Sequence, residues 1–280
     1  MGEVEAARER YAQEFAYTAH LTSAAVLRAF ARVPRERYLG PGPWRIFQPY
    51  GRFYWTTPDA DPRHLYHDVL VAIDEQRLLN NGQPGFLASL IEALDPRAGD
   101  HVVHVGCGTG YYTAILAELA GPAGRVTALD VDAELAARSR DNLADLPHVE
   151  VLHGDGGDHD AGPADAIFVN AGATHPRQIW LDTLRPRGRL LLPLTGLSRT
   201  GWVLKVVRQE QGYAATFVSS IAIFPCTGAR DPDTARLLDE AFMSGGWAAV
   251  HSLRRDSHPG EATCWLHTDT LCLSTLEPGA

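Results

Sequence analysis

The fold is indicated most clearly by the segment His101-Val-Val-His-Val-Gly-Cys-Gly-Thr-Gly-Tyr-Tyr-Thr-Ala114. An apolar strand over 101–105 runs into a turn with three glycines, and the pattern over 112–120 predicts a helix. Glycine has no side chain, so such a strand–turn–helix unit lets the backbone approach a ligand closely. Asp130 follows at the end of the next apolar stretch, where a carboxylate can accept hydrogen bonds from both hydroxyls of a ribose.

Strands and helices alternate on both sides of this unit. Predicted helices cover 85–94, 112–120, 133–143 and 177–184, and predicted strands cover 101–105, 125–129, 149–152, 166–169 and 189–193. This alternation predicts an α/β fold of the Rossmann-like kind, a doubly wound and mostly parallel sheet. Two further apolar stretches, 202–207 and 214–223, are separated by a turn at Gln211-Gly212 and predict an antiparallel end of the sheet.

The chain divides into three predicted regions. Residues 1–83 form a region of helical pattern that ends in aromatic, irregular sequence, and 84–224 form the α/β core. Residues 225–280 form a C-terminal extension with a predicted helix at about 232–243. The purpose of the extension does not follow from the sequence.

Composition and charge exclude several kinds of protein and of binding partner. The 280 residues are 45% hydrophobic and 21% charged, which excludes a disordered or fibrous chain. The net charge of −9 argues against a general nucleic-acid binder, which needs a basic surface. The apolar runs are far shorter than the roughly 20 residues that cross a bilayer, and no secretory signal is evident. We therefore expect a cytoplasmic protein with neither nucleic acid nor a membrane as partner; the oligomeric state stays open.

The spacing of the glycines indicates which nucleoside binds. A dinucleotide site has the pattern G-x-G-x-x-G, whereas Gly106, Gly108 and Gly110 follow G-x-G-x-G, and the tyrosines after them would crowd a pyrophosphate. The pattern, with its downstream acid, resembles that of class I S-adenosylmethionine-dependent methyltransferases. Asp155, at the end of a later strand, can receive the adenine amino group. The predicted cofactor is S-adenosyl-L-methionine, with S-adenosyl-L-homocysteine as product. The predicted contacts are His104, Gly106, Cys107 through its backbone amide, Gly108, Gly110, Asp130, Val131, Asp155, Gly156 and Asn170. Packing at the end of the strand is the alternative for His104.

Several further segments resemble those of one family, the protein-L-isoaspartate O-methyltransferases. They are Phe30 to Tyr38 (F-x-x-V-P-R-x-x-F in the family), Tyr66 to Leu70, Asn81 to Ala88 (I-S-Q-P-x-x-x-A), Gly106 to Ala114, Gly154 to Gly156, Asp165 to Ala173 and Leu184 to Pro193. The resemblance covers about 30–224 and keeps the order of the motifs. It implies methyl transfer to the free carboxylate of an isoaspartyl residue in a peptide or protein. The methyl ester then collapses to a succinimide.

The resemblance also assigns an acceptor side. It places Asp68, Asn81 and Gly82 among the catalytic residues and Asn80, Gln83 and Pro84 among the substrate-binding residues. The family has serine or threonine where this chain has Gly82. Asn81, or a backbone amide exposed by the glycine, is an alternative donor, and the glycine is expected to widen the pocket.

This departure leaves the acceptor open. A wider pocket favours an ordinary aspartate in a constrained peptide, so that the aspartimide is a modification of a ribosomal peptide natural product. Repair of isoaspartyl residues and methylation of a small molecule are the alternatives within the enzyme class. A non-catalytic module that binds S-adenosylmethionine and a partner is the competing class.

The cysteines permit one metal hypothesis. Cys226, Cys264, His267 and Cys272 can be drawn as a ligand set, but they lack the paired C-x2-C spacing of a zinc knuckle. The sequence therefore favours small buried apolar cysteines and no metal.

Overall fold

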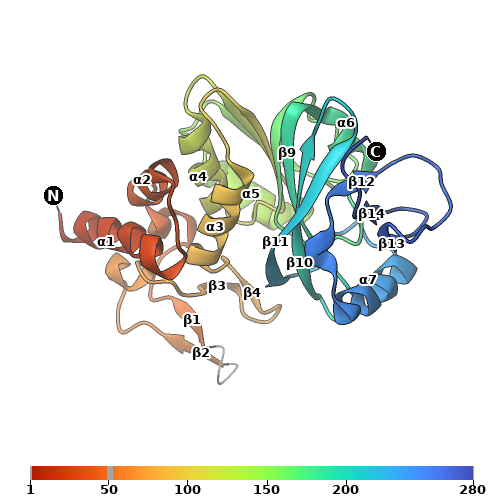
Figure 1. Ribbon diagram of the computed structural model, residues 1–280. Coiled ribbons are helices and arrows are strands. Elements are labelled where there is room, and N and C mark those ends of the chain that lie inside the picture. The colour runs from red at the N-terminus through yellow and green to blue at the C-terminus, as the bar shows by residue number, and fades with distance from the viewer. Residues whose placement is uncertain (1, 49–52, 280) are drawn as a thin grey trace.

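The computed structural model describes residues 2–48 and 53–279 (Figure 1). The helices in these residues are α1 (Glu3–Thr18), α2 (Ala24–Arg32), α3 (Pro84–Leu94), α4 (Tyr111–Ala120), α5 (Ala133–Asn142), α6 (Gln178–Thr183) and α7 (Pro232–Ser244). The strands are β1 (Arg45–Gln48), β2 (Phe53–Thr56), β3 (Ala72–Asp74), β4 (Leu79–Asn80), β5 (His101–Val105), β6 (Arg125–Asp130), β7 (Val149–His153), β8 (Ala164–Val169), β9 (Leu184–Thr195), β10 (Thr200–Arg208), β11 (Tyr213–Ala222), β12 (Ser252–Arg254), β13 (Cys264–His267) and β14 (Cys272–Ser274). Among these helices, none is long and apolar enough to span a membrane.

The central sheet has ten strands in the order β13-β14-β12-β11-β10-β9-β8-β5-β6-β7. The strands from β9 to β7 in this order run parallel to their neighbours, with the crossovers of a doubly wound fold. From β9 to β13 the neighbours are antiparallel. The predicted α/β sheet with an antiparallel end is confirmed.

Helices cover both faces of the sheet because the side chains of each buried strand alternate between them. On β5, Val102 joins the buried cluster that contains α1, α2, α3 and α4. Val103 and Val105 point the other way, into the cluster that contains α6 and α7. Both faces are therefore apolar, as expected for parallel strands buried on two sides.

The N-terminal helices share the first cluster with the core helices. The rings of Phe30 in α2 and Tyr111 in α4 meet edge to face, with centroids 6.1 Å apart. Figure 1 shows α1 and α2 on the side of the molecule opposite the C-terminal extension. The division of the chain after 83 and after 224 stays a prediction, since the first two regions have a common core.

The extension completes the sheet. Helix α7 extends the predicted 232–243 by one residue, and β12, β14 and β13 add three short strands beyond β11. Sequence patterns did not predict these strands because each has only three or four residues, too few for an alternating pattern.

Gly110 packs two helices together at the end of the glycine turn. It begins α4 with φ +94°, a backbone conformation that side chains disfavour. A Cβ atom there would lie 2.8 Å from the Ser139 hydroxyl oxygen and 2.9 Å from a methyl of Leu143. This glycine is needed for close approach of α4 to α5.

We predict that Gly110→Ala destabilises the fold more than Gly99→Ala does. Gly99 has a similar φ of +88° but no atom within 4 Å of an added Cβ, so the control keeps the backbone cost and lacks the steric clash. The difference in the free energy of unfolding, measured by urea denaturation, should be about 1–3 kcal/mol. Equal losses in the two variants would contradict the packing role.

Candidate active site

A cavity of about 860 Å³ opens at the carboxyl ends of the parallel strands. This edge of a doubly wound sheet is where such folds bind ligands. One half of the cavity is formed by the loops after β5, β6, β7 and β8. The other half is formed by residues 79–83 and the end of β11, so segments far apart in the sequence meet there.

The backbone amides of the glycine turn are already used within the protein. The N–H groups of Gly106 and Cys107 donate to the carbonyl of Leu129, at 2.8 and 3.1 Å. The N–H of Gly108 donates to the Asp130 carboxylate at 2.8 Å. A dinucleotide site aims such amides at a pyrophosphate, so this turn favours a nucleoside without phosphates.

Asp130 is held by two backbone hydrogen bonds at the end of β6. One carboxylate oxygen accepts from Gly108 and the other from the N–H of Asp132, at 3.0 Å. The residue is 7% exposed, and burial raises the pKa of its carboxyl although these hydrogen bonds oppose the shift. The carboxylate lines the cavity with unused lone pairs, which suits paired hydroxyls such as those of a ribose.

The loop after β7 is also fixed in place. Asp155 accepts a hydrogen bond from the N–H of Gly157 at 2.8 Å, and the indole of Trp180 donates to the Gly156 carbonyl at 2.7 Å. A Cβ on Gly156 would lie 2.6 Å from Val105, so only glycine lets this loop approach β5. The predicted adenine-binding residues therefore lie in a rigid loop at the cavity wall.

Most of the predicted cofactor residues line the cavity. They are Gly106, Cys107, Gly108, Asp130, Val131, Asp155, Gly156 and Asn170. The predicted role of the Cys107 amide is wrong, because that amide is bonded to Leu129. Gly110 lies outside the cavity, where its role is helix packing.

His104 also lies outside the cavity, contrary to the sequence-based prediction. Its ring is fully buried, stacked on Phe168, and its Nδ1 is 2.9 Å from the Thr113 hydroxyl. Burial lowers the pKa of His104 to about 3, so the imidazole is neutral at neutral pH. The side chain lies near the end of β5 but packs in the core instead of reaching the loop beyond it.

We call the half of the cavity formed by residues 79–83 and the end of β11 the acceptor half, because it holds residues predicted to bind the acceptor. These are Asn80, Asn81, Gly82 and Gln83. Asp68 and Pro84 are not in the cavity wall. Asp68 accepts from the N–H of Gly85 at 2.7 Å and from the Gln83 amide at 2.9 Å. Asp68 thus positions Gln83 and the start of α3, and Pro84 is the buried first residue of that helix.

Asn81 is the most buried polar residue of this half, at 6% exposure. One end of its amide faces the Thr109 hydroxyl at 3.4 Å, and its Oδ1 has no partner among the described residues. The Thr109 hydroxyl can pair with either the NH₂ group or the oxygen of the Asn81 amide. The other end of the amide can therefore donate to a ligand or accept from one.

Gly82 does not leave the expected open space. It has φ +79°, and a Cβ there would lie 3.3 Å from both Leu87 and Tyr112. The Tyr112 hydroxyl donates to the Gly82 carbonyl at 3.2 Å. The prediction that glycine widens the pocket is wrong, since the Tyr112 ring fills that space and places a hydroxyl beside the loop.

Sequence reasoning missed a cation at the acceptor half. Arg199, in the turn between β9 and β10, lines the cavity. Within residues 2–48 and 53–279 its guanidinium has no hydrogen-bond or ion-pair partner, whereas Arg77, across the cavity, pairs with Asp132. Nothing in the local sequence marks Arg199, because it is brought to the cavity by the long β9–β10 pair.

A model of one protein family, described as protein-L-isoaspartate(D-aspartate) O-methyltransferase, matches residues 9–230 of this chain. The match begins earlier than the resemblance over 30–224 and ends close to it. It includes both halves of the cavity.

Individual relatives carry the same name. The protein-L-isoaspartate O-methyltransferase 2 of Archaeoglobus fulgidus is 31% identical over 209 residues, which cover 73% of this chain and 85% of that one. The Alteromonas mediterranea enzyme is 30% identical over 213 residues, covering 75% and 90%. A solved protein-L-isoaspartate O-methyltransferase superposes with a TM-score of 0.65 at 21% identity, over 84% of this chain and 69% of that chain.

A Plasmodium falciparum protein described as a protein-L-isoaspartate O-methyltransferase, solved with S-adenosyl-L-homocysteine, superposes with a TM-score of 0.63 at 17% identity. It covers 79% of this chain and 98% of that one. These superpositions establish the fold.

We predict that Asp130→Asn weakens binding of S-adenosylmethionine about 10- to 150-fold. A charge-assisted hydrogen bond contributes about 1.5–3 kcal/mol, and the amide can accept at one position only. Isothermal titration calorimetry gives the Kd. Asp141→Asn removes the same charge from the exposed face of α5 and should leave the Kd unchanged.

The Kd measured in the same titration should depend on pH. Because burial raises the pKa of Asp130, the carboxylate is protonated at a higher pH than an exposed aspartate. The affinity of the unmodified chain for S-adenosylmethionine should fall as the pH is lowered and Asp130 is protonated. The Asp130→Asn chain should lack the part of this fall that comes from Asp130. Matching pH profiles would exclude Asp130 as the hydrogen-bond acceptor.

Proposed function

This chain belongs to the protein-L-isoaspartate(D-aspartate) O-methyltransferase family and is an S-adenosylmethionine-dependent O-methyltransferase, and we propose that it methylates the side-chain carboxylate of an isoaspartyl residue in a protein or peptide. The observation that supports this acceptor is the lining of the cavity. The nucleoside-binding loops share one space with an acceptor wall that contains Arg199, whose guanidinium has no ion-pair partner within residues 2–48 and 53–279.

The residues of the nucleoside half fit the cofactor. Asp130 would hold the ribose hydroxyls, and Asp155 the adenine amino group. When bound, S-adenosylmethionine supplies a methyl group on a positively charged sulfur. The amides of the glycine turn stay bonded to Leu129 and Asp130, so the turn keeps its shape without a ligand.

The acceptor needs orientation and no general base. A carboxylate is ionised at neutral pH, so its oxygen is already nucleophilic. Arg199 would bind one carboxylate oxygen through its planar guanidinium, and the Asn81 amide would fix the other side of the group. Alignment of two reactants in this way supplies several kcal/mol of the barrier reduction.

Methyl transfer needs no reactant besides the carboxylate and S-adenosylmethionine, and only the later opening of the product consumes water. One carboxylate oxygen forms a bond to the methyl carbon as the carbon–sulfur bond breaks, which leaves a methyl ester and S-adenosylhomocysteine. The backbone nitrogen of the next residue then attacks the ester carbonyl, and the proton it loses leaves with methoxide as methanol. Water opens the resulting succinimide to aspartate or isoaspartate.

A second acceptor is an ordinary aspartate in a constrained ribosomal peptide, with the aspartimide as the product. The observation in its favour is the loop at Gly82, where the side-chain hydroxyl of the family is absent and the Tyr112 hydroxyl is bonded to the backbone. An altered acceptor loop is expected for an enzyme with an altered acceptor.

Two peptides that differ only in aspartate or isoaspartate at one position test the proposal. Each is incubated with the enzyme and S-adenosylmethionine and followed by intact mass for the added methyl and the later loss of methanol. We expect turnover of the isoaspartyl peptide alone. Turnover of the aspartyl peptide would contradict isoaspartyl repair. Turnover of neither peptide, while the cofactor still binds, would also contradict it and would favour the constrained acceptor.

We further predict that Arg199→Ala and Asn81→Ala each raise the KM for the active peptide by about tenfold, the equivalent of ~1.4 kcal/mol. The Kd for S-adenosylmethionine should not change. Arg187→Ala is a matched control, because Arg187 is also exposed and has φ +64° against +62° for Arg199 but lies outside the cavity. An equal KM effect of Arg187→Ala would exclude a specific contact by Arg199.

A further inference from the structure

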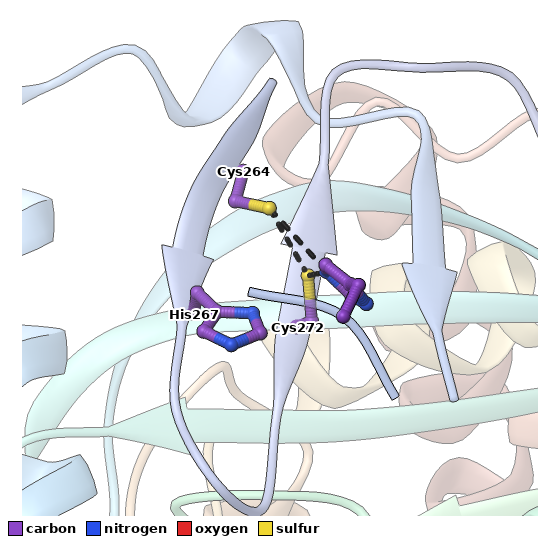
Figure 2. Close-up of side chains that lie close together, drawn as sticks. Cys264, His267 and Cys272 are labelled. Atoms are coloured by element: carbon purple, nitrogen blue, oxygen red, sulfur yellow. Dashed lines mark hydrogen bonds between the residues drawn. The ribbon is translucent and has the colours of Figure 1, made fainter. Parts of the chain in front are cut away.

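Four potential metal ligands of the C-terminal extension converge on one point. His258, Cys264, His267 and Cys272 each place a ligand atom within 4.8 Å of the others. Figure 2 shows Cys264, His267 and Cys272 facing one another from the β13–β14 hairpin. Three of them were candidate ligands in the sequence together with Cys226, which instead lies in the wall of the main cavity.

The interatomic distances fit a tetrahedral ion. The two cysteine sulfurs are 3.6 Å apart, and the Nε2 of His258 is 3.5 Å from Cys264 and 3.3 Å from Cys272. Zinc–ligand bonds of about 2.3 Å to sulfur and about 2.0–2.1 Å to nitrogen at tetrahedral angles separate two sulfurs by about 3.8 Å and a sulfur from a nitrogen by about 3.5 Å. A disulfide would need the sulfurs at about 2.05 Å.

An irregularity in β13 brings two of the ligands to one side. Cys264 and His267 are three residues apart, and on a regular strand their side chains would point to opposite faces. The register of β13 against β14 shifts between Cys264 and Leu266, and His267 is the direct cross-strand partner of Cys272. Such bulges re-aim side chains at functional positions.

The imidazole of His258 is oriented from outside the cluster. Its Nδ1 lies 2.9 Å from the carbonyl oxygen of Asp256 and 3.2 Å from the Asp256 carboxylate, which leaves Nε2 to face the cysteines. Arg254 holds that carboxylate at 2.6 Å. Metal-bound histidines have such partners on the second ring nitrogen.

His267 supplies an independent indication. Its Nδ1 is buried and has no hydrogen-bond partner among the described residues. A buried polar atom without a partner is costly, and a ligand bond to this imidazole would remove that cost.

We propose that His258, Cys264, His267 and Cys272 bind one structural Zn²⁺ ion. Two thiolates and two imidazoles are the donors that zinc prefers, and four protein ligands leave no open position for catalysis. The ion joins the hairpin to the segment that carries His258 and so holds β13 and β14 at the edge of the sheet.

Metal content tests the proposal directly. The full chain, expressed without a polyhistidine tag in zinc-supplemented medium, should contain one zinc ion per chain by inductively coupled plasma mass spectrometry. Cys264→Ser and Cys272→Ser should each lose the metal. Cys226→Ser removes a buried cysteine outside the cluster and should keep it.

Two measurements do not depend on the variants' folding. Exchange of the unmodified chain with Co²⁺ should give the intense visible bands of a tetrahedral ion and thiolate charge-transfer absorption, and chelation should lower the Tm. A chain that contains no zinc, a Cys264–Cys272 disulfide in peptide mass analysis, or metal loss in Cys226→Ser equal to that in Cys264→Ser would overturn the proposal.

Discussion

The hydrogen bonds between the glycine turn and the end of β6 are the constraint on which the cavity depends. The Leu129 carbonyl and the Asp130 carboxylate together accept the amides of Gly106, Cys107 and Gly108. These bonds fix the turn against its neighbouring strand and occupy the backbone amides that would otherwise bind a phosphate. They also leave the Asp130 carboxylate in the cavity. Under the proposed function, the position of the nucleoside, and with it the direction in which a methyl group faces the acceptor wall, follows from them.

The acceptor wall is formed by segments that lie outside the parallel part of the sheet. The β3–β4 hairpin places Asn80 to Gln83 opposite the turn, and the Tyr112 hydroxyl ties that loop to α4. The antiparallel end of the sheet supplies the remaining wall, including Arg199 and the end of β11. The parallel half of the sheet thus determines the cofactor chemistry, and the segments around it determine which carboxylate can enter.

The sequence predicted the parts of the structure that local patterns determine. The strand at 101–105 and the helix that follows the glycines have strong periodic or glycine signals, and their predicted bounds agree with β5 and α4 within one residue. The sequence left both a cofactor contact and packing open for His104, because its position beside the loop says nothing about which face of β5 it occupies. Arg199 could not be found, since the long β9–β10 pair brings it to the cavity. His258 could not be found either, because it lies in the irregular loop between β12 and β13, where no periodic pattern marks it.

We propose that one cavity aligns a carboxylate with the methyl donor. This alignment would be visible in a crystal structure of the chain with S-adenosylhomocysteine and an isoaspartyl peptide. We expect the nucleoside on Asp130 and Asp155 and the isoaspartyl carboxylate between Asn81 and Arg199, with an oxygen directed at the sulfur of the homocysteine. A peptide bound away from this wall, or a nucleoside bound without contact to Asp130, would contradict this alignment.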